Sequence, residues 1–458
     1  MPASADFRPV VPPHDEASGN GDAGAALLDR VRRELGIDRG STVLPPPPTV
    51  PLPSRLATGT LAWASVSAAV LAAGCSPVSL DPARVAIAYR SDRVLTIDGD
   101  APPVWSPYSG FWETTDGWVR THGNYPHHAA ALRAGLHLRE DADPAAVRVA
   151  LAERRTATAV SDITSAGGLA VPVAVERPAV DRALRERPLL EVSRVDEESA
   201  SHPRRSELTA TSPGSLPLSG MRVLDLTRVI AGPVCTRTLA LLGADVLRID
   251  PPHLPEPAWQ HLDTGHGKRS AILDARSARL QELLGEADAV VLGYRPAALD
   301  RLGLHPELLA RRHPGLIVAQ LSAWGTESPN RAGFDSLVQA ESGISRIESA
   351  EGGRPGALPA QALDHSAGYL LAAAVTTLLR RRSREGGSRI VRTSLRRIAA
   401  ELLGMPRRGD PAAEVEFDVR PHLARFDVDG SALVTARPAL PGFEFRAPHP
   451  WGSDQPVW

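Results

Sequence analysis

The stretch MRVLDLTRVIAGP at residues 221–233 is followed closely by ALLGADVLRID at residues 240–250. Each holds a short, continuous apolar run, and a helical segment from about residue 233 to 242 separates the two runs. Such runs are typical of parallel strands that are buried on both faces. Further expected helices and strands follow at residues 278–284, 289–292, 306–312 and 316–321. We therefore predict an α/β fold built on a Rossmann-like parallel sheet.

The rest of the chain divides at segments whose composition does not suit a packed core. We expect residues 1–25 to be disordered, residues 199–217 to be a linker rich in Ser, Pro and Arg, and residues 404–458 to form an extended tail. Two folded parts remain. Residues 26–198 are predicted to hold a helical segment and a small α+β domain, and residues 218–403 the Rossmann-like domain with the binding and catalytic site.

Within the N-terminal part, the apolar pattern predicts both helices and strands. A hairpin is expected at residues 112–120, turning at Asp116-Gly117, because this dipeptide suits a positive φ. The other expected elements are helices at 54–73, 129–136 and 145–152 and a strand at 85–89.

Composition excludes several classes of protein. The chain has 458 residues and a formal net charge of -2, so no overall field attracts it to nucleic acid or to an anionic membrane. The longest apolar stretch, residues 61–74, is interrupted by serines and is shorter than the roughly 20 residues of a membrane span. The two cysteines, Cys75 and Cys235, lack C-x-x-C partners, which argues against disulfides and thiolate metal sites. A cytoplasmic protein without a bound metal is expected.

The loop after the first strand does not suit a dinucleotide. It contains one glycine, Gly232, where the dinucleotide fingerprint requires three to let the backbone approach a pyrophosphate. Asp250, at the end of the second strand, stands where a ribose-binding acid belongs and is the only feature in favour. We expect no nicotinamide or flavin.

A series of ordered pieces, taken together, resembles family III CoA-transferases, the superfamily of formyl-CoA and carnitine CoA-transferases and of α-methylacyl-CoA racemases. The pieces continue through Asp364 and the apolar helix after it. They are LSGMRVLDL (218–226), RVIAGP (228–233), LLGADV (241–246), GKRS (267–270), YRP (294–296), LDRLG (299–303), FD (334–335), QA (339–340) and SG (342–343).

The resemblance implies an activity and a set of site residues. Such an enzyme moves CoA from an acyl-CoA to a free carboxylic acid through an aspartyl-CoA intermediate, and Asp364 aligns with the catalytic aspartate. Coenzyme A is then a co-substrate, and no cofactor is bound permanently. The resemblance implies an interlocked homodimer, with a fused, pseudo-dimeric monomer as the alternative. The residues expected to bind CoA are Val229, Ile230, Ala231, Lys268, Arg269, Tyr294, Arg295 and Arg301.

Each of these residues also has a plain structural interpretation. Asp364 could be an N-cap of the helix that follows it, and Lys268 with Arg269 could be a solvated charge pair. The pair His127-His128 lacks a third ligand at metal spacing and is expected to be a solvated helix start.

The chain also departs from the family pattern. The section from 108 to 195 resembles the small domain that usually follows the Rossmann-like part, so the order is permuted or the chain is a fused pair of halves. The glycine-rich loop of formyl-CoA transferase has no counterpart. Two alternatives to CoA transfer remain. A racemase-like isomerase is disfavoured because Phe334 stands where racemases carry a histidine, and a catalytically silent CoA-binding relative is disfavoured by Asp364.

Overall fold

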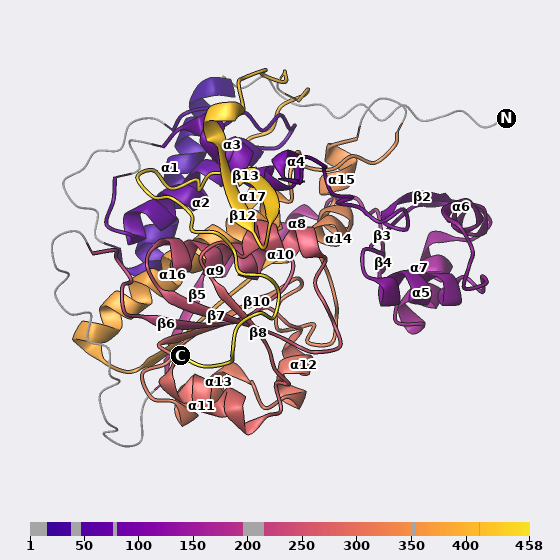
Figure 1. Ribbon diagram of the computed structural model, residues 1–458. Coiled ribbons are helices and arrows are strands. Elements are labelled where there is room, and N and C mark those ends of the chain that lie inside the picture. Colours follow the sequence, from indigo (N-terminus) through magenta and orange to yellow (C-terminus); the bar gives the residue numbers. More distant parts are fainter. Residues whose placement is uncertain (1–15, 38–46, 77–79, 196–214, 350–352, 412) are drawn as a thin grey trace.

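The computed structural model describes residues 16–37, 47–76, 80–195, 215–349, 353–411 and 413–458. At its centre lies a seven-stranded sheet with the order β5-β11-β10-β9-β6-β7-β8 (Figure 1). All neighbours run parallel except β5, which is antiparallel to β11. The strands are β5 (Glu191–Val195), β6 (Arg222–Leu226), β7 (Asp245–Asp250), β8 (Arg269–Ile272), β9 (Ala289–Leu292), β10 (Ile317–Ser322) and β11 (Ser388–Ser394). The predicted α/β fold class is confirmed.

Helices cover both faces of this sheet. α9 (Ala231–Leu241) and α16 (Ala362–Glu385) lie on one face, and α11 (Ala278–Glu286) and α13 (Pro306–Arg312) lie on the other (Figure 1). In β6, Val223 belongs to the apolar cluster under α9 and α16, whereas Leu224 belongs to the cluster under α11. Successive side chains of a strand point to opposite faces, which explains why the strands are apolar throughout.

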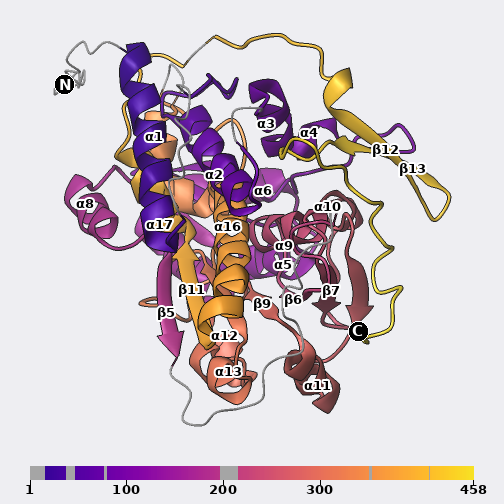
Figure 2. The ribbon, with the colours of Figure 1, turned by 90° about the vertical axis from the view of Figure 1, so that its left-hand side faces the viewer.

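The helix α16 is the centre of the larger apolar cluster. α1 (Glu16–Leu35) and α2 (Thr58–Ala72) stand beside it (Figure 2). By length and hydropathy α16 could cross a bilayer, but its apolar window is 100% buried within the protein. This is the environment of a core helix.

The small domain projects from one side of the sheet (Figure 1). It consists of the antiparallel sheet β2 (Gly110–Thr114), β3 (Gly117–Thr121) and β4 (Ala170–Pro172) with helices α5 (Pro126–Gly135), α6 (Pro144–Ala152) and α7 (Thr156–Ser165). Its own core includes Trp112, Val119 and Leu132. The predicted smaller α+β domain is therefore present.

A third sheet joins the N-terminal part of the chain to the C-terminal tail. The strand β1 (Thr96–Ile97) pairs with β13 (Ser431–Ala436), which pairs in turn with β12 (Leu423–Val428). The remaining elements are α3 (Pro82–Tyr89), α4 (Ser91–Val94), α8 (Pro178–Glu186), α10 (Ala258–Thr264), α12 (Pro296–Arg301), α14 (Asp335–Ser342), α15 (Ile344–Ile347), α17 (Leu395–Leu403) and the 3-10 turn η2 (Arg420–His422).

Two local predictions in the N-terminal part are wrong. The expected strand at 85–89 is the helix α3, because the Asp81 side chain accepts the N–H of Ala83 at 2.9 Å and Pro82 fixes the first helical position. The hairpin turns at Thr115-Asp116, one residue early, since Thr114 pairs with Gly117. The Asp116 side chain instead accepts the N–H of Thr156.

The predicted ends and linker also differ in part. Residues 1–15 and most of 199–217 lie outside the described residues. The start of α1 at Glu16 makes the end of the expected disordered segment helical. The expected extended tail contains the β12–β13 hairpin, and its last residue reaches back to the sheet domain, where the indole of Trp458 donates to the carbonyl of Leu283 at 3.0 Å.

Candidate active site

The loop between β6 and α9 holds a strained residue at the carboxyl edge of the sheet. Val229 has a φ of 73°, a conformation that a β-branched residue adopts only when the surrounding structure imposes it. Val229 and Ala231 line a cavity, whereas Ile230 packs against the core. α9 begins at Ala231 without a side-chain cap. Ligands of α/β proteins bind at this edge of the sheet.

The start of α16 brings Asp364 to the same cavity. Asp364 lines it and is only 6% exposed. It is the third residue of α16, whose N-cap is Gln361, so the N-cap role that the sequence allowed is wrong. One turn later, a Cβ on Gly368 would stand 2.7 Å from the carbonyl oxygen of Ala231. This close approach of α16 to α9 brings Asp364 beside the strained loop.

A second buried carboxylate lies next to Asp364. The backbone N–H of Asp364 donates to Oδ2 of Asp335 at 2.9 Å, and the Asp335 side chain is wholly buried. Burial and the neighbouring Asp335 raise the pKa of Asp364 well above its ordinary value. Burial also raises the pKa of Asp335, to about 6, although the hydrogen bonds that it accepts oppose the rise. The two acids form one coupled pair.

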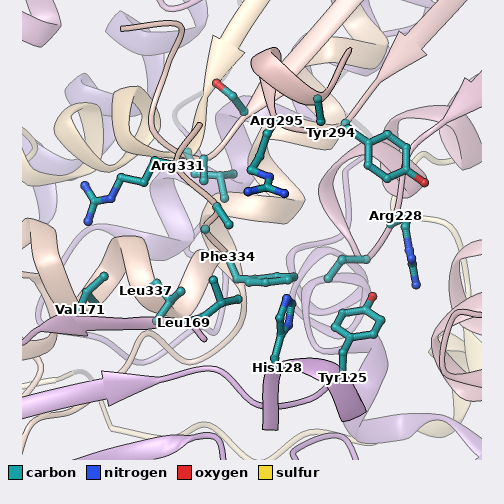
Figure 3. Close-up of a pocket in the computed structure, with 18 of the residues that line it drawn as sticks. Tyr125, His128, Leu169, Val171, Arg228, Tyr294, Arg295, Arg331, Phe334 and Leu337 are labelled. Carbon is teal, nitrogen blue, oxygen red and sulfur yellow. The ribbon is translucent and has the colours of Figure 1, made fainter. Parts of the chain in front are cut away.

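The cavity has a volume of about 750 Å³, within the usual range for ligand sites. The Rossmann-like domain supplies one wall, including Tyr294, Arg295 and Phe334 (Figure 3). The small domain supplies the other wall, including His128 and Leu169. A single chain therefore contributes both walls of the cavity.

One end of the cavity is basic. Arg228, Arg295, His127 and His128 line it. The exposed guanidinium of Arg295 donates to the carbonyl of Asn330 at 3.2 Å and forms no ion pair with a carboxylate of the described residues. Burial and then the positive neighbours lower the pKa of His128 to about 4. An anionic ligand would relieve this concentration of positive charge.

The other end is apolar. Leu169 and Val171 of the small domain meet Leu337 and Phe334 there (Figure 3). Arg331 stands at the same end, but both of its Nη atoms donate to Glu341 and its guanidinium lies 3.7 Å from the centre of the Trp324 ring. Among the described residues that line this end of the cavity, no cation therefore lacks a partner.

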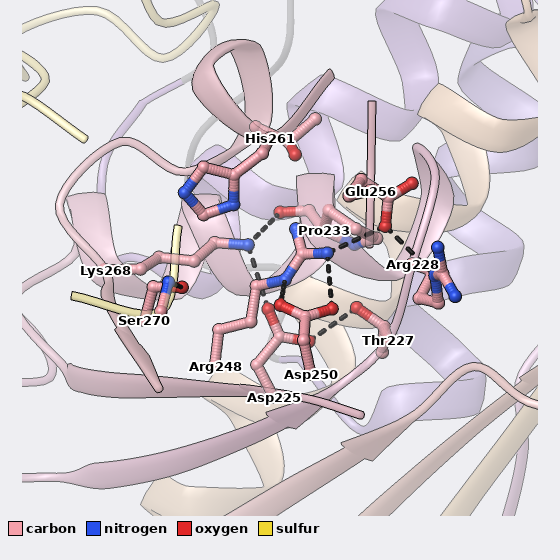
Figure 4. A network of polar contacts seen from close by, with 12 residues as sticks. Asp225, Thr227, Arg228, Pro233, Arg248, Asp250, Glu256, His261, Lys268 and Ser270 are labelled. Carbon is pink, nitrogen blue, oxygen red and sulfur yellow. Dashed lines mark hydrogen bonds and ion pairs between the residues drawn. The ribbon is translucent and has the colours of Figure 1, made fainter. Parts of the chain in front are cut away.

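Buried ion pairs hold Arg228 of the basic end in place (Figure 4). Glu256 is wholly enclosed and accepts hydrogen bonds from Arg228 at 3.2 Å, Arg248 at 2.8 Å and the Tyr125 hydroxyl at 2.7 Å. Burial alone would raise the pKa of Glu256, but the two arginines lower it. Since Tyr125 belongs to the small domain, Glu256 also fixes that domain against the sheet.

Lys268, which was expected to meet CoA phosphates, departs from its prediction. Its side chain is 1% exposed, and Nζ donates to Oδ2 of Asp225 and to the carbonyl of Pro233, both at 2.9 Å (Figure 4). It does not line the cavity. Because the ammonium is enclosed and bonded within the core, we assign Lys268 a structural role.

Two predicted arginines also lie outside the cavity lining. Arg269 is on β8 at the edge of the sheet, where it pairs with Asp245 at 2.9 Å and donates to the carbonyl of Val457 at 2.5 Å. The binding prediction for Arg269 is therefore corrected, because its charge is already paired. Arg301 is the exposed last residue of α12, the helix that begins beside Arg295. Its role in binding stays a prediction.

The sequence prediction missed the small-domain wall. His127 and His128 do begin the helix α5, as expected, but they line the cavity instead of facing bulk solvent alone. The sequence argument excluded a metal site at these two histidines because a third ligand is missing, but this argument does not address the binding of an anion. Arg228 was quoted within the loop motif without a role, although its position directly after a parallel strand was the signal that could have identified it.

The family model of CoA-transferase family III matches residues 218–408. This part of the chain is therefore similar to CoA-transferase family III. The match includes every strand of the sheet except β5 and contains Asp364 and the loop after β6.

Similar proteins carry CoA-transferase names. The chain is 33% identical over 211 residues to the probable fatty acyl-CoA transferase Rv3272 of Mycobacterium tuberculosis, covering 42% of this chain and 54% of that protein. It is 34% identical to the mouse succinyl-CoA:glutarate CoA-transferase, covering 30% of this chain and 36% of that enzyme. The formyl-CoA:oxalate CoA-transferase of Bradyrhizobium diazoefficiens is 30% identical, with 38% and 45% covered.

The matched segments are only parts of both partners. A crystal structure of Rv3272 is 32% identical, covers 41% of this chain and 57% of that chain, and gives a TM-score of 0.38. The chain thus spans about half the length of the family III proteins that it matches, or less.

Proposed function

We propose that the protein transfers CoA from an acyl-CoA thioester to a free carboxylic acid, with Asp364 as the covalent nucleophile. The observation that supports it most is the position of Asp364, a buried carboxylate that lines a cavity at the carboxyl edge of the sheet. Its raised pKa is typical of functional carboxylates in closed sites. The match of the surrounding segment to the model of family III supports the same reaction.

The proposed reaction exchanges acyl groups without hydrolysis. A carboxylate oxygen of Asp364 attacks the thioester carbon, the C–S bond breaks, and a mixed anhydride forms as CoA thiolate leaves. The thiolate then attacks the aspartyl carbonyl, which gives aspartyl-CoA and frees the donor acid. The acceptor acid attacks aspartyl-CoA, the thiolate leaves again, and its attack on the acceptor carbonyl of the second anhydride restores the Asp364 carboxylate. Backbone N–H groups of residues 229–231 are the proposed donors to the oxyanions.

The two ends of the cavity suggest how the acyl-CoA lies. The phosphates would occupy the basic end, where Arg295 offers an exposed guanidinium. The acyl group would occupy the apolar end, which adjoins Asp364 because Leu337 stands two residues after Asp335 on α14. Since Arg331 is engaged by Glu341, we propose an acyl group without a second carboxylate.

The experiment is turnover in the presence of a trap. Hydroxylamine or borohydride added during exchange between butyryl-CoA and a free acid should modify Asp364, as read by peptide mass. Asp364→Asn should lower the exchange rate by roughly a thousandfold or more, because the nucleophile is lost. Asp300→Asn, at an exposed position outside the cavity, is the matched control. Full exchange by the Asn variant, or a label on another residue, would reject the scheme.

A racemase is the competing function. It needs two acid/base groups on opposite faces of the α-carbon, and the phenyl ring of Phe334 lines the cavity where racemases carry a histidine. Incubation of a 2-methylacyl-CoA in heavy water distinguishes the two reactions. We expect no exchange of the α-proton, and fast exchange without CoA transfer would favour the racemase.

The assembly and location of the protein remain proposals. We propose a homodimer, as the family resemblance implies, and a cytoplasmic location, which the two cysteines without C-x-x-C partners favour. The tail from Gly404 onward contacts its own sheet domain through Trp458. Light scattering distinguishes a mass of 48.7 kDa from twice that value.

A further inference from the structure

We infer that Asp335 is the positioning residue of this site: its buried carboxylate holds the first turn of α16 and thereby fixes the nucleophile Asp364. The expected effect on kcat rests on the proposed function. The hydrogen bonds between Asp335 and the first turn of α16 do not depend on it.

Four residues form a chain of hydrogen bonds, here called the relay, in which the backbone N–H groups at both ends fix which atoms donate and which accept. The backbone N–H of Leu358 donates to Oε1 of Gln339 at 2.8 Å. The amide Nε2 of Gln339 then donates to Oδ1 of Asp335, and the N–H of Asp364 donates to Oδ2 at 2.9 Å. Asp335 and Gln339 are one helical turn apart on α14. Together they hold both ends of the segment that leads into α16.

Asp335 acts as the N-terminal cap of α16, although it lies on another helix. α16 has no side-chain cap of its own at Gln361, and the first N–H groups of a helix need acceptors from elsewhere. Asp335 accepts from Asp364 and also from the N–H of Leu363. A carboxylate from another helix therefore closes the first turn of α16, and the orientation of Asp364 depends on it.

The charges around the pair come from several elements. Arg120 of β3, only 9% exposed, acts on Asp335 from the small domain, and its guanidinium lies 4.7 Å from the centre of the Phe111 ring. Burial, and then Arg237 of α9, lower the pKa of the adjacent His365 to about 3, so its ring is neutral near pH 7. The cavity side carries Arg228 and His128. Asp335 is the only acid that acts directly on Asp364 among the described residues.

Replacing Asp335 by Asn breaks the relay in a defined way. If the Asn oxygen accepts from Asp364, its NH₂ group faces the NH₂ group of Gln339. Gln339 cannot turn over to repair this, because its oxygen is needed by the N–H of Leu358. One buried donor is therefore left without an acceptor, and the negative charge beside Asp364 is lost.

The kinetic test compares Asp335→Asn with Ser336→Ala. The Ser336 hydroxyl is buried one residue away and has no hydrogen-bond partner among the described residues. We expect Asp335→Asn to lower kcat by roughly tenfold to a hundredfold, with a much smaller change in KM. Asp364 acts as a carboxylate, so activity rises with pH as its proton is lost. Removing the neighbouring charge lowers its pKa and should move this rise to lower pH by about one unit.

A second measurement does not depend on turnover. Carbodiimide reacts with protonated carboxyl groups, so peptide mass reports the pH at which Asp364 loses its proton. The midpoint should fall by about one pH unit in Asp335→Asn and stay unchanged in Ser336→Ala. An unchanged midpoint, or a kcat and pH profile like those of wild type, would overturn the inference. If the wild type exchanges no acyl-CoA, the proposed function fails. The labelling experiment then still tests whether Asp335 acts on Asp364.

A further variant keeps the inference testable if Asp335→Asn does not fold. Gln339→Ala keeps both carboxylates and removes the donor to Oδ1 of Asp335. It should reduce kcat by a smaller factor, about threefold to tenfold, without lowering the labelling midpoint of Asp364. A Gln339→Ala enzyme with wild-type kcat would contradict the relay.

Discussion

Two buried aspartates of the same domain, Asp225 and Asp364, have opposite surroundings. The Asp225 carboxylate is fully buried and accepts hydrogen bonds from Thr227, Thr236 at 2.6 Å and the Lys268 ammonium at 2.9 Å. The Asp364 carboxylate has no hydrogen-bond donor within the described residues, and, besides burial, the charge that raises its pKa is that of another acid, Asp335.

The difference separates a structural charge from a reactive one. A buried carboxylate that is fully paired is held in place, and its oxygens are not available to attack a ligand because they already accept hydrogen bonds. A buried carboxylate without donors is costly to ionise, which raises its pKa and leaves its oxygens free to attack a ligand. The same distinction applies to the cations, because Lys268 and Arg269 are paired with acids whereas Arg295 is not.

The largest effect on stability is expected at the paired aspartate. Lys268→Met leaves Asp225 buried without its counter-charge, so the free energy of unfolding should fall by about 3–5 kcal/mol. Asp364→Asn removes an unpaired buried acid and should not lower the free energy of unfolding at pH 7. Urea denaturation of both variants measures the contrast.

A double variant provides the control. Asp225→Asn combined with Lys268→Met removes both charges and should recover part of the loss. A stable Lys268→Met protein with a raised KM for acyl-CoA would contradict the comparison, because Lys268 would then act as a phosphate ligand after all.

Much of the sheet was predictable from sequence because its inner strands are apolar on both faces. The four expected strands correspond to β6, β7, β9 and β10. The strand β11 was missed since arginines interrupt its apolar residues in SRIVRTS, and β5 because its partner lies far along the chain. The helix α3 was misread as a strand although Asp81-Pro82 is a helix-start signal.

The site was predictable only where the signal is local. Asp364 and the loop after β6 are ordered motifs of a known family, and the structure places both at the cavity. The small-domain wall depends on contacts between distant segments, as between Tyr125 and Glu256. The burial of Lys268 depends on Asp225, 43 residues earlier. No local pattern distinguishes such a lysine from one that faces a ligand.

An intermediate effect is expected for the unpaired cation of the basic end. Arg295→Ala should raise the KM for acyl-CoA by roughly tenfold, because a charge-assisted contact to a phosphate is lost. The KM for the acceptor acid should stay nearly unchanged. Arg269→Ala is the matched control, since its guanidinium is already paired with Asp245, and it should leave both KM values as they are. Equal effects of the two variants would remove the distinction between paired and unpaired cations.

The smallest effect on the KM for acyl-CoA is expected at Arg301. This residue extends the comparison of paired and unpaired cations to one outside the cavity. Arg301 ends α12, is exposed and forms no ion pair with a carboxylate of the described residues. If it assists the phosphates from outside the cavity, Arg301→Ala should raise the KM for acyl-CoA about twofold to fivefold at low ionic strength. Because salt screens exposed charges beyond roughly 8–10 Å, the increase should vanish at about 0.5 M salt, whereas the effect of Arg295→Ala should persist in part. Steady-state kinetics at two salt concentrations measures both variants, and an unchanged KM at low salt would exclude Arg301 from CoA binding.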